Sequence, residues 1–190
     1  MMNRNMQIIG LECPFVITKF LKHDEIKGNL LELINSTECE TIKPDLELVE
    51  LEKKLGPQDN VARLDWSKSS DFERPWVKYF MPYFVDTYTE ICTKIGYNDI
   101  QIRDVWFQQY LKNGTHGWHT HSYNYSGVYY LEYPDGAPST EFRPLSNEIY
   151  TLDDLKEGDF ITFPSFLWHR APEVLDVNRK TIISFNIDLK

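Results

Sequence analysis

Three histidines in the second half of the chain have the spacing of metal ligands. His119 and His121 alternate within the segment GTHGWHTH, and His169 ends the later segment GDFITFPSFLWH. On a β-strand, residues i and i+2 project from the same face, so we expect the first two imidazoles to lie side by side. Two such imidazoles can chelate one metal ion at about 2.1 Å per bond. The sequence therefore predicts a metal site that His169 completes once later strands return the chain.

An arginine, Arg179, follows the histidine pattern at the start of the last predicted strand. Arg179 shares the odd parity at which residues 181–189 carry most of their apolar bulk, so we expect its side chain to point inward. A buried guanidinium needs an anion, and no acidic residue of that strand shares this parity. A dicarboxylate ligand would supply the missing charge.

Helical periodicity dominates the N-terminal half of the chain. A first helix is expected from Asp24, a second from Asp45 to Leu55, and a third from a capping-box pattern at Ser70 and Glu73 to Gly96. Aromatic residues recur every three or four positions in the third helix, which predicts a face that covers a sheet. Pro75 fits the first turn of this helix, whereas Pro82 is expected to kink or break it. An extended segment over 6–18 precedes the helices.

The second half reads as a run of short strands separated by turn signals. The strands are expected over 100–111, 118–121, 128–133, 160–163 and 181–189. Helices followed by strands predict an α+β fold, with a closed or sandwiched β core and helices packed on one side. The 190 residues are expected to form a single domain, with a helical part over about 1–97 and a β core over about 98–190.

The amino-acid composition argues against nucleic acid and membrane as partners of this protein. Lysine and arginine number 20 and aspartate and glutamate 29, so the net charge is 20 − 29 = −9, and no basic cluster predicts nucleic-acid binding. No apolar run reaches the length of a membrane span, and the first ten residues do not read as a signal peptide. Three widely spaced cysteines favour a reducing compartment. We expect a cytoplasmic protein, with the aromatic residues of the third helix suited to a homodimer.

Four segments together resemble the 2-oxoglutarate/Fe(II)-dependent dioxygenase superfamily, and most closely a family of 2OG-Fe(II) oxygenases within it. That family carries H-x-H, then S-G-V-Y-Y, then G-x-L-x-x-F-P-S-x-L-x-H, then R-x-S-I-S-F-N. The resemblance covers roughly residues 106–189, and the prolyl-hydroxylase-type members also echo the segment from Tyr110 to His119 and the strand Tyr129–Leu131. The counterparts here are His119–His121, Ser126–Tyr130, Gly158–His169 and Arg179–Asn186.

The resemblance implies a fold, a co-substrate and a set of ligands. The fold would be a double-stranded β-helix, or jelly roll. His119, His121 and His169 would bind Fe(II), and Arg179 and Tyr130 would bind the distal carboxylate of 2-oxoglutarate. Tyr110 would lie near the metal-chelating end of the co-substrate. With O2, such an enzyme hydroxylates a C–H bond of a small-molecule or peptide substrate and releases succinate and CO2.

Position 121 departs from the superfamily, which has Asp or Glu there in a facial triad of two histidines and a carboxylate. Three neutral imidazoles leave the metal at +2, which dianionic 2-oxoglutarate can neutralise. Two alternatives stay open on the same residues. A cupin-type metalloenzyme also uses three histidines but offers no role for Arg179, and a jelly-roll binding module would hold a metal without turnover. Aromatic residues near the histidines are candidates for an apolar shell: Trp118, Trp168, Phe163 and Phe185.

Overall fold

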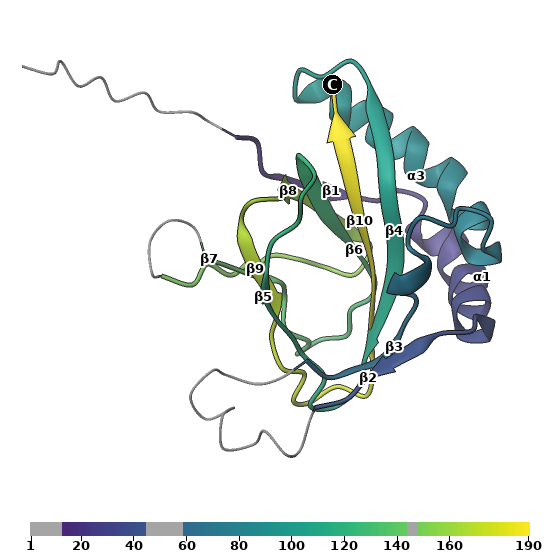
Figure 1. Ribbon diagram of the computed structural model, residues 1–190, viewed down its shortest axis with the longest axis vertical. Helices are drawn as coiled ribbons and strands as arrows, with labels where there is room; N and C mark the ends of the chain where they lie inside the picture. Colours follow the sequence, from purple (N-terminus) through teal and green to yellow (C-terminus); the bar gives the residue numbers. More distant parts are fainter. Residues whose placement is uncertain (1–12, 45–58, 144–147) are drawn as a thin grey trace, which may run out of the picture.

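The computed structural model describes residues 13–44, 59–143 and 148–190, in which two antiparallel sheets face each other (Figure 1). The larger sheet has seven strands in the order β1-β8-β6-β10-β4-β3-β2, and the smaller has three in the order β5-β9-β7. The strands of the larger sheet are β1 (Val16–Lys19), β2 (Glu40–Ile42), β3 (Val61–Leu64), β4 (Ile100–Tyr110), β6 (Tyr125–Glu132), β8 (Asp159–Pro164) and β10 (Lys180–Leu189). Those of the smaller sheet are β5 (His116–His119), β7 (Glu141–Arg143) and β9 (Trp168–Ala171).

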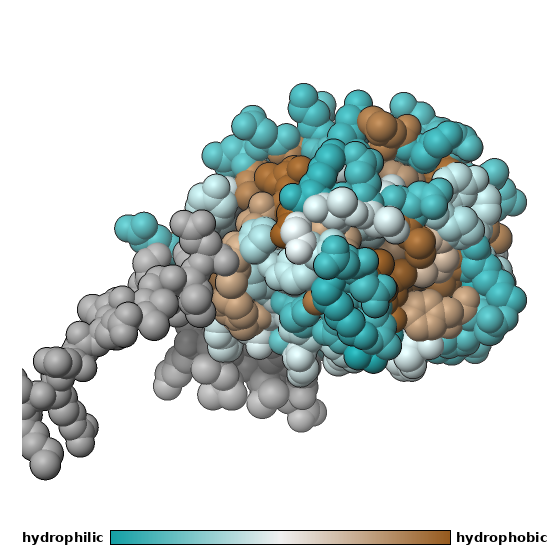
Figure 2. Space-filling model, turned by 90° about the horizontal axis from the view of Figure 1, so that it is seen from above, coloured by the Kyte–Doolittle hydropathy of each residue, from teal (hydrophilic) through white to brown (hydrophobic). Residues whose placement is uncertain are grey.

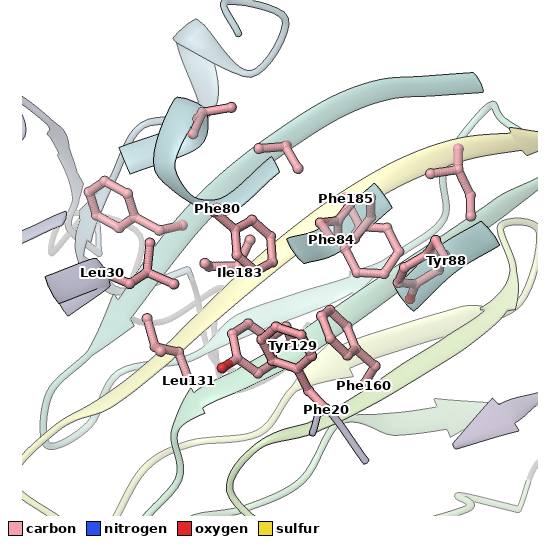
Figure 3. Packing of buried hydrophobic residues seen from close by; sticks show 14 of the residues in the cluster. Phe20, Leu30, Phe80, Phe84, Tyr88, Tyr129, Leu131, Phe160, Ile183 and Phe185 are labelled. Atoms are coloured by element: carbon pink, nitrogen blue, oxygen red, sulfur yellow. The ribbon is translucent and has the colours of Figure 1, made fainter. Parts of the chain in front are cut away.

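Helices α1 (His23–Ser36) and α3 (Pro75–Lys94) lie on the side of the larger sheet that faces away from the smaller one (Figure 1). The aromatic stripe of α3 is buried there, as the periodicity predicts. Phe80, Phe84 and Tyr88 pack against residues of β6, β8 and β10, including Phe160 and Phe185 (Figure 3). The predicted jelly-roll core is confirmed, and the described helices α1 and α3 pack on one face of its larger sheet.

Strand β10 is buried on both faces, and its two faces contact different cores. The odd positions from Ile183 to Leu189 join the cluster under the helices. The even position Ile182 joins the cluster between the two sheets. At Gly127 of β6, directly opposite Phe185 in the register, an added Cβ would lie 2.1 Å from the Phe185 ring, so only glycine lets this ring cross the neighbouring strand.

The N-terminal half contributes more than helices. β1 pairs with β8, and β2 and β3 extend the other end of the larger sheet, so strands from the N-terminal half complete both ends of this sheet. The expected segment 6–18 corresponds to β1 where it is described, and the expected helix from Asp45 to Leu55 lies outside the described residues.

Helix α3 begins later than predicted. The capping box of Ser70 and Glu73 does not form; instead, the Asp71 carboxylate accepts the Glu73 N–H at 2.9 Å. Arg74 is extended (ψ 134°), because the residue before a proline is disfavoured in the helical region, and the helix starts at Pro75. The helix also runs through Pro82 without a break, since buried aromatic residues before and after it anchor both halves to the sheet.

The remaining surface is mixed. Seen from above, the molecule shows hydrophilic residues over much of the visible face with apolar residues among them (Figure 2). Cys13 is exposed, Cys39 half-buried and Cys92 buried, and all three are free thiols. In the described part of the chain no helix is long and apolar enough to cross a membrane.

The packing of α3 on the sheet predicts a steep cost for truncating its stripe. Phe84 is fully buried, with its ring centroid 4.4 Å from that of Tyr88. We expect Phe84→Ala to lower the free energy of unfolding by about 3–5 kcal/mol, measured by urea denaturation. The neighbouring Val85 is 39% exposed, so Val85→Ala should change it by less than about 0.5 kcal/mol. Equal losses in the two variants would contradict this account of the core.

Candidate metal and co-substrate site

The three predicted metal ligands meet on the inner side of the smaller sheet. His119 ends β5 and lies opposite His169 of β9 in the antiparallel register. His121 follows two residues after the end of β5, where its backbone N–H donates to the Ser165 carbonyl at 2.9 Å. The expected strand over 118–121 is therefore β5 displaced by two residues, but the predicted juxtaposition forms: one ring nitrogen of each histidine lies within 4.8 Å of the other two.

Hydrogen bonds orient two of these imidazoles. The Nδ1–H of His119 donates to the Gly117 carbonyl at 2.7 Å, and the Nδ1–H of His169 donates to the Leu167 carbonyl at 2.9 Å. This tautomer leaves Nε2 of each ring with a free lone pair, as a metal ligand requires.

All three imidazoles are neutral near pH 7. Burial, reinforced by the neighbouring histidines, lowers the pKa of His119 and of His121 to about 4 and that of His169 well below its ordinary value. Three neutral nitrogen donors that converge from one side fit a divalent transition metal such as Fe(II) and leave its other positions open. The residues present thus fit the metal that the sequence predicts.

A cavity of about 290 Å³ lies between the two sheets and is shared by the three histidines. Its inner part is lined by Tyr110, Thr140 and Ile182. Trp66, which is 58% exposed, and the half-exposed Asp59 line it where it approaches solvent. The cavity therefore has both fully buried and solvent-exposed residues in its lining.

Lys180 is a buried cation that does not line this cavity itself but lies behind Tyr110, which does. Its side chain is fully buried, and its Nζ donates to the Pro138 carbonyl at 2.6 Å. The same atom lies 5.7 Å from each of the ring centroids of Tyr110, Tyr130 and Tyr133. No carboxylate of the described residues forms an ion pair with it, and burial lowers its pKa to about 7. A buried ammonium without a counter-ion favours an anionic ligand.

The predicted inward orientation of Arg179 is wrong. Its guanidinium is partly exposed and forms a 2.7 Å ion pair with Glu132 of β6, and Arg179 does not line the cavity of the histidines. The prediction assumed that the more apolar face of the last strand points toward the ligand site. That face packs on the helices, and the cation that reaches the cluster between the sheets is the next residue, Lys180, whose Nζ lies near the rings of Tyr110 and Tyr130.

The two predicted tyrosines lie close to Lys180. Tyr110 lies opposite Lys180 in the register of β4 and β10 and lines the cavity. Tyr130 is fully buried; its hydroxyl is 2.8 Å from Oγ1 of Thr140 and accepts the Thr140 N–H at 3.1 Å. Burial raises the pKa of both tyrosines, so their hydroxyls stay protonated and can donate hydrogen bonds.

The expected aromatic shell is only half present. Phe163 and Phe185 line the cavity. Trp168 is 52% exposed. The ring of Trp118 contacts two arginines, whose guanidinium carbons lie 4.9 Å (Arg143) and 4.8 Å (Arg170) from its centroid. Neither tryptophan lines the cavity, because each neighbours a histidine whose side chain takes the inner face of the strand.

Sequence reasoning missed Lys180, Asp59 and His116. The first had a signal, since its parity partners Ser184 and Asn186 are polar, as is common on the wall of a cavity. Asp59 and His116 had none, because the first lies far from the histidine pattern and the second was one more histidine in a turn-rich segment. His116 Nδ1 is buried and lies 3.4 Å from Asp59 Oδ1, although the two atoms do not have hydrogen-bond geometry. The pKa of Asp59 is lowered to about 2, mainly by the adjacent His116; burial acts in the opposite direction, and the Gly117 N–H lowers the pKa further.

Solved structures resemble this architecture along most of its length. A 2OG-Fe(II) oxygenase family oxidoreductase from Burkholderia pseudomallei superposes with a TM-score of 0.68 at 11% identity, covering 92% of this chain and 85% of its own. A prolyl-4-hydroxylase from Pseudomonas putida gives 0.58 at 12%, covering 90% and 91%. The chain has the fold of the 2OG-Fe(II) oxygenases.

A third structure widens the chemistry found on this fold. The non-heme alpha ketoglutarate dependent epimerase SnoN of nogalamycin biosynthesis gives a TM-score of 0.63 at 9% identity, covering 91% of this chain and 76% of its own. No protein-family model matches the sequence, and no curated protein does. The likeness to the 2OG-Fe(II) oxygenases is thus one of fold, and function must be argued from the site.

The lowered histidine pKa values predict an acid-sensitive metal-free protein. Unfolded histidines take up protons below about pH 6.5, whereas His119 and His121 in the fold resist protonation until about pH 4. The free energy of unfolding should therefore fall as pH drops from about 6.5 to 4, by up to about 3 kcal/mol for each histidine. Urea denaturation of chelator-treated protein measures this, and the double variant His119→Gln/His121→Gln should show a much flatter profile. Identical slopes would contradict the assignment.

Proposed function

We propose that this protein is an Fe(II)- and 2-oxoglutarate-dependent oxygenase that hydroxylates a C–H bond of a small-molecule or peptide substrate. The observation that carries the proposal is that three neutral histidines share one jelly-roll cavity with Tyr110, and that behind Tyr110 lies a buried lysine with no carboxylate partner among the described residues. The histidines suit the metal, and the lysine suits the far carboxylate of a dicarboxylate. The fold shared with 2OG-Fe(II) oxygenases supports the same conclusion.

Each residue has a role that follows from its place. His119, His121 and His169 would hold Fe(II) through one nitrogen each. Lys180 would pair with the distal carboxylate of 2-oxoglutarate, in the role that the sequence assigned to Arg179. Tyr110 and Tyr130 surround the Lys180 ammonium, so their protonated hydroxyls can donate to the co-substrate.

The metal centre, with 2-oxoglutarate and O2, would supply the oxidising power and release succinate and CO2. The protein would supply orientation and a shielded site. Apolar walls that include Phe163 and Ile182 exclude water from the inner part, and the exposed rim at Trp66 admits the substrate. Three neutral imidazoles would leave the charge of the metal at +2, which the dianionic co-substrate would balance.

The lysine distinguishes this function from its alternatives. A cupin-type three-histidine enzyme has no role for a buried ammonium behind the cavity residue Tyr110, and a binding module would need one only for an anionic ligand. Desolvating that charge lowers stability unless a ligand anion compensates, so its presence favours a function that binds a carboxylate.

An anaerobic titration tests the proposal. Fe(II) and then 2-oxoglutarate are added to metal-free protein, and the visible charge-transfer band of the chelated co-substrate is followed. We expect the band in the wild type and its loss in His169→Ala. The Kd for 2-oxoglutarate should be at least tenfold higher in Lys180→Met, because the distal carboxylate of the co-substrate then has no ammonium to pair with. Arg179→Ala is the matched control and should leave the Kd within about twofold.

Three other results would contradict the proposal. Iron binding without a band would favour the cupin-type chemistry. No metal binding would leave the jelly-roll binding module. A weakened band in Arg179→Ala with a normal one in Lys180→Met would return the carboxylate-binding role to the arginine.

The pKa of Lys180 predicts how co-substrate affinity depends on pH. A carboxylate pairs with the ammonium form, and in the free protein this form is lost as pH rises through about 7. Affinity for 2-oxoglutarate should therefore be level below pH 7 and fall about tenfold for each further pH unit until the pKa of the complex is reached. Calorimetric titration between pH 6 and 9 measures this. Lys180→Arg keeps its charge throughout and should abolish the dependence.

A further inference from the structure

Asp59 lies outside the histidine pattern in sequence but next to it in space. Asn60 and Thr115 exchange two backbone hydrogen bonds of 2.9 Å, which hold the segment that contains Asp59 against the start of β5. From there the Asp59 carboxylate accepts the Gly117 N–H at 2.6 Å through Oδ1. An acidic side chain is thus fixed to the strand that carries a predicted metal ligand.

Gly117 connects this carboxylate to His119. Its N–H is bound by Asp59, and its carbonyl accepts the His119 Nδ1–H at 2.7 Å. A Cβ at position 117 would lie 3.3 Å from Asp59 Oδ1, so the contact is already close. Because the carbonyl that orients the imidazole belongs to the residue that the carboxylate holds, movement of Asp59 would be transmitted to the ligand.

Asp59 also brings a negative charge to the proposed metal site. It is the one acidic side chain among the described residues that line the cavity. The three-histidine set contributes no negative charge to a divalent ion, whereas a set with one carboxylate would contribute one. A fixed anion one residue contact away from His119 would compensate in part for the negative charge that three imidazoles lack.

We propose that Asp59 is a positioning residue of the metal site. Through Gly117 it orients His119, and its charge stabilises a divalent ion in a cage of neutral imidazoles. This inference rests on the metal site of the proposed function, although it requires neither 2-oxoglutarate nor turnover. Partners beyond the immediate ligands commonly change metal affinity by about 10–100-fold, so the effect is measurable.

Titration of the metal-free full chain with Co(II), against a competing chelator, tests this role. We expect Asp59→Asn to raise the Kd for Co(II) about tenfold, and Asp59→Ala to raise it at least as much. The ligand-field spectrum of saturated Co(II) Asp59→Asn should also differ from that of the wild type, since His119 is held less firmly. A general loss of stability would not change that spectrum.

Asp71→Asn is the matched control. Asp71 also accepts a single backbone N–H, from Glu73 at 2.9 Å, but does not line the cavity. Its variant should bind Co(II) within twofold of the wild type. An unchanged Kd and spectrum in Asp59→Asn would overturn the inference, as would an equal loss in Asp71→Asn. If the wild type binds no Co(II), the proposed function fails as well, whereas normal wild-type binding with insensitive Asp59 variants overturns this inference alone.

Discussion

The antiparallel pairing of β5 with β9 is the constraint on which the site depends. It sets His119 opposite His169 and turns both imidazoles to the inner face of the smaller sheet, with their outer-face neighbours Trp118 and Trp168 excluded from the cavity. A register shift of one residue would exchange those faces. Backbone pairing of His121 with Ser165 then brings the third imidazole to the same point without extending the strand.

Strand β10 couples this site to the rest of the molecule. Its odd side chains pack under α1 and α3, and its even side chains face the smaller sheet, so one strand joins the largest core to the cavity wall. That double burial stabilises the larger sheet and also encloses Lys180, whose ammonium lies near tyrosine rings and not in water. The unfavourable burial of this charge is local, and the aromatic core beneath the helices supplies ample burial to compensate for it.

Periodicity predicted much of this arrangement correctly. The strand run, the sheet-covering aromatic helix and the grouping of three histidines all follow from alternation at two or about 3.6 residues, which one buried face enforces. The same reasoning failed for Arg179, because a strand buried on both faces does not indicate by its apolar parity which face is the inner one. It also failed for the start of α3, where the constraint before Pro75 outweighed a capping pattern.

The sequence by itself determined the residue types that the chemistry needs and the local geometry of each element. Only the tertiary structure decided that Lys180, and not Arg179, is buried behind the cavity residue Tyr110, and that Asp59 contacts Gly117. Those contacts join segments far apart in the chain, and they depend on strand register and on which sheet face the helices cover. Both are set by the simultaneous packing of all elements, so no local pattern encodes them.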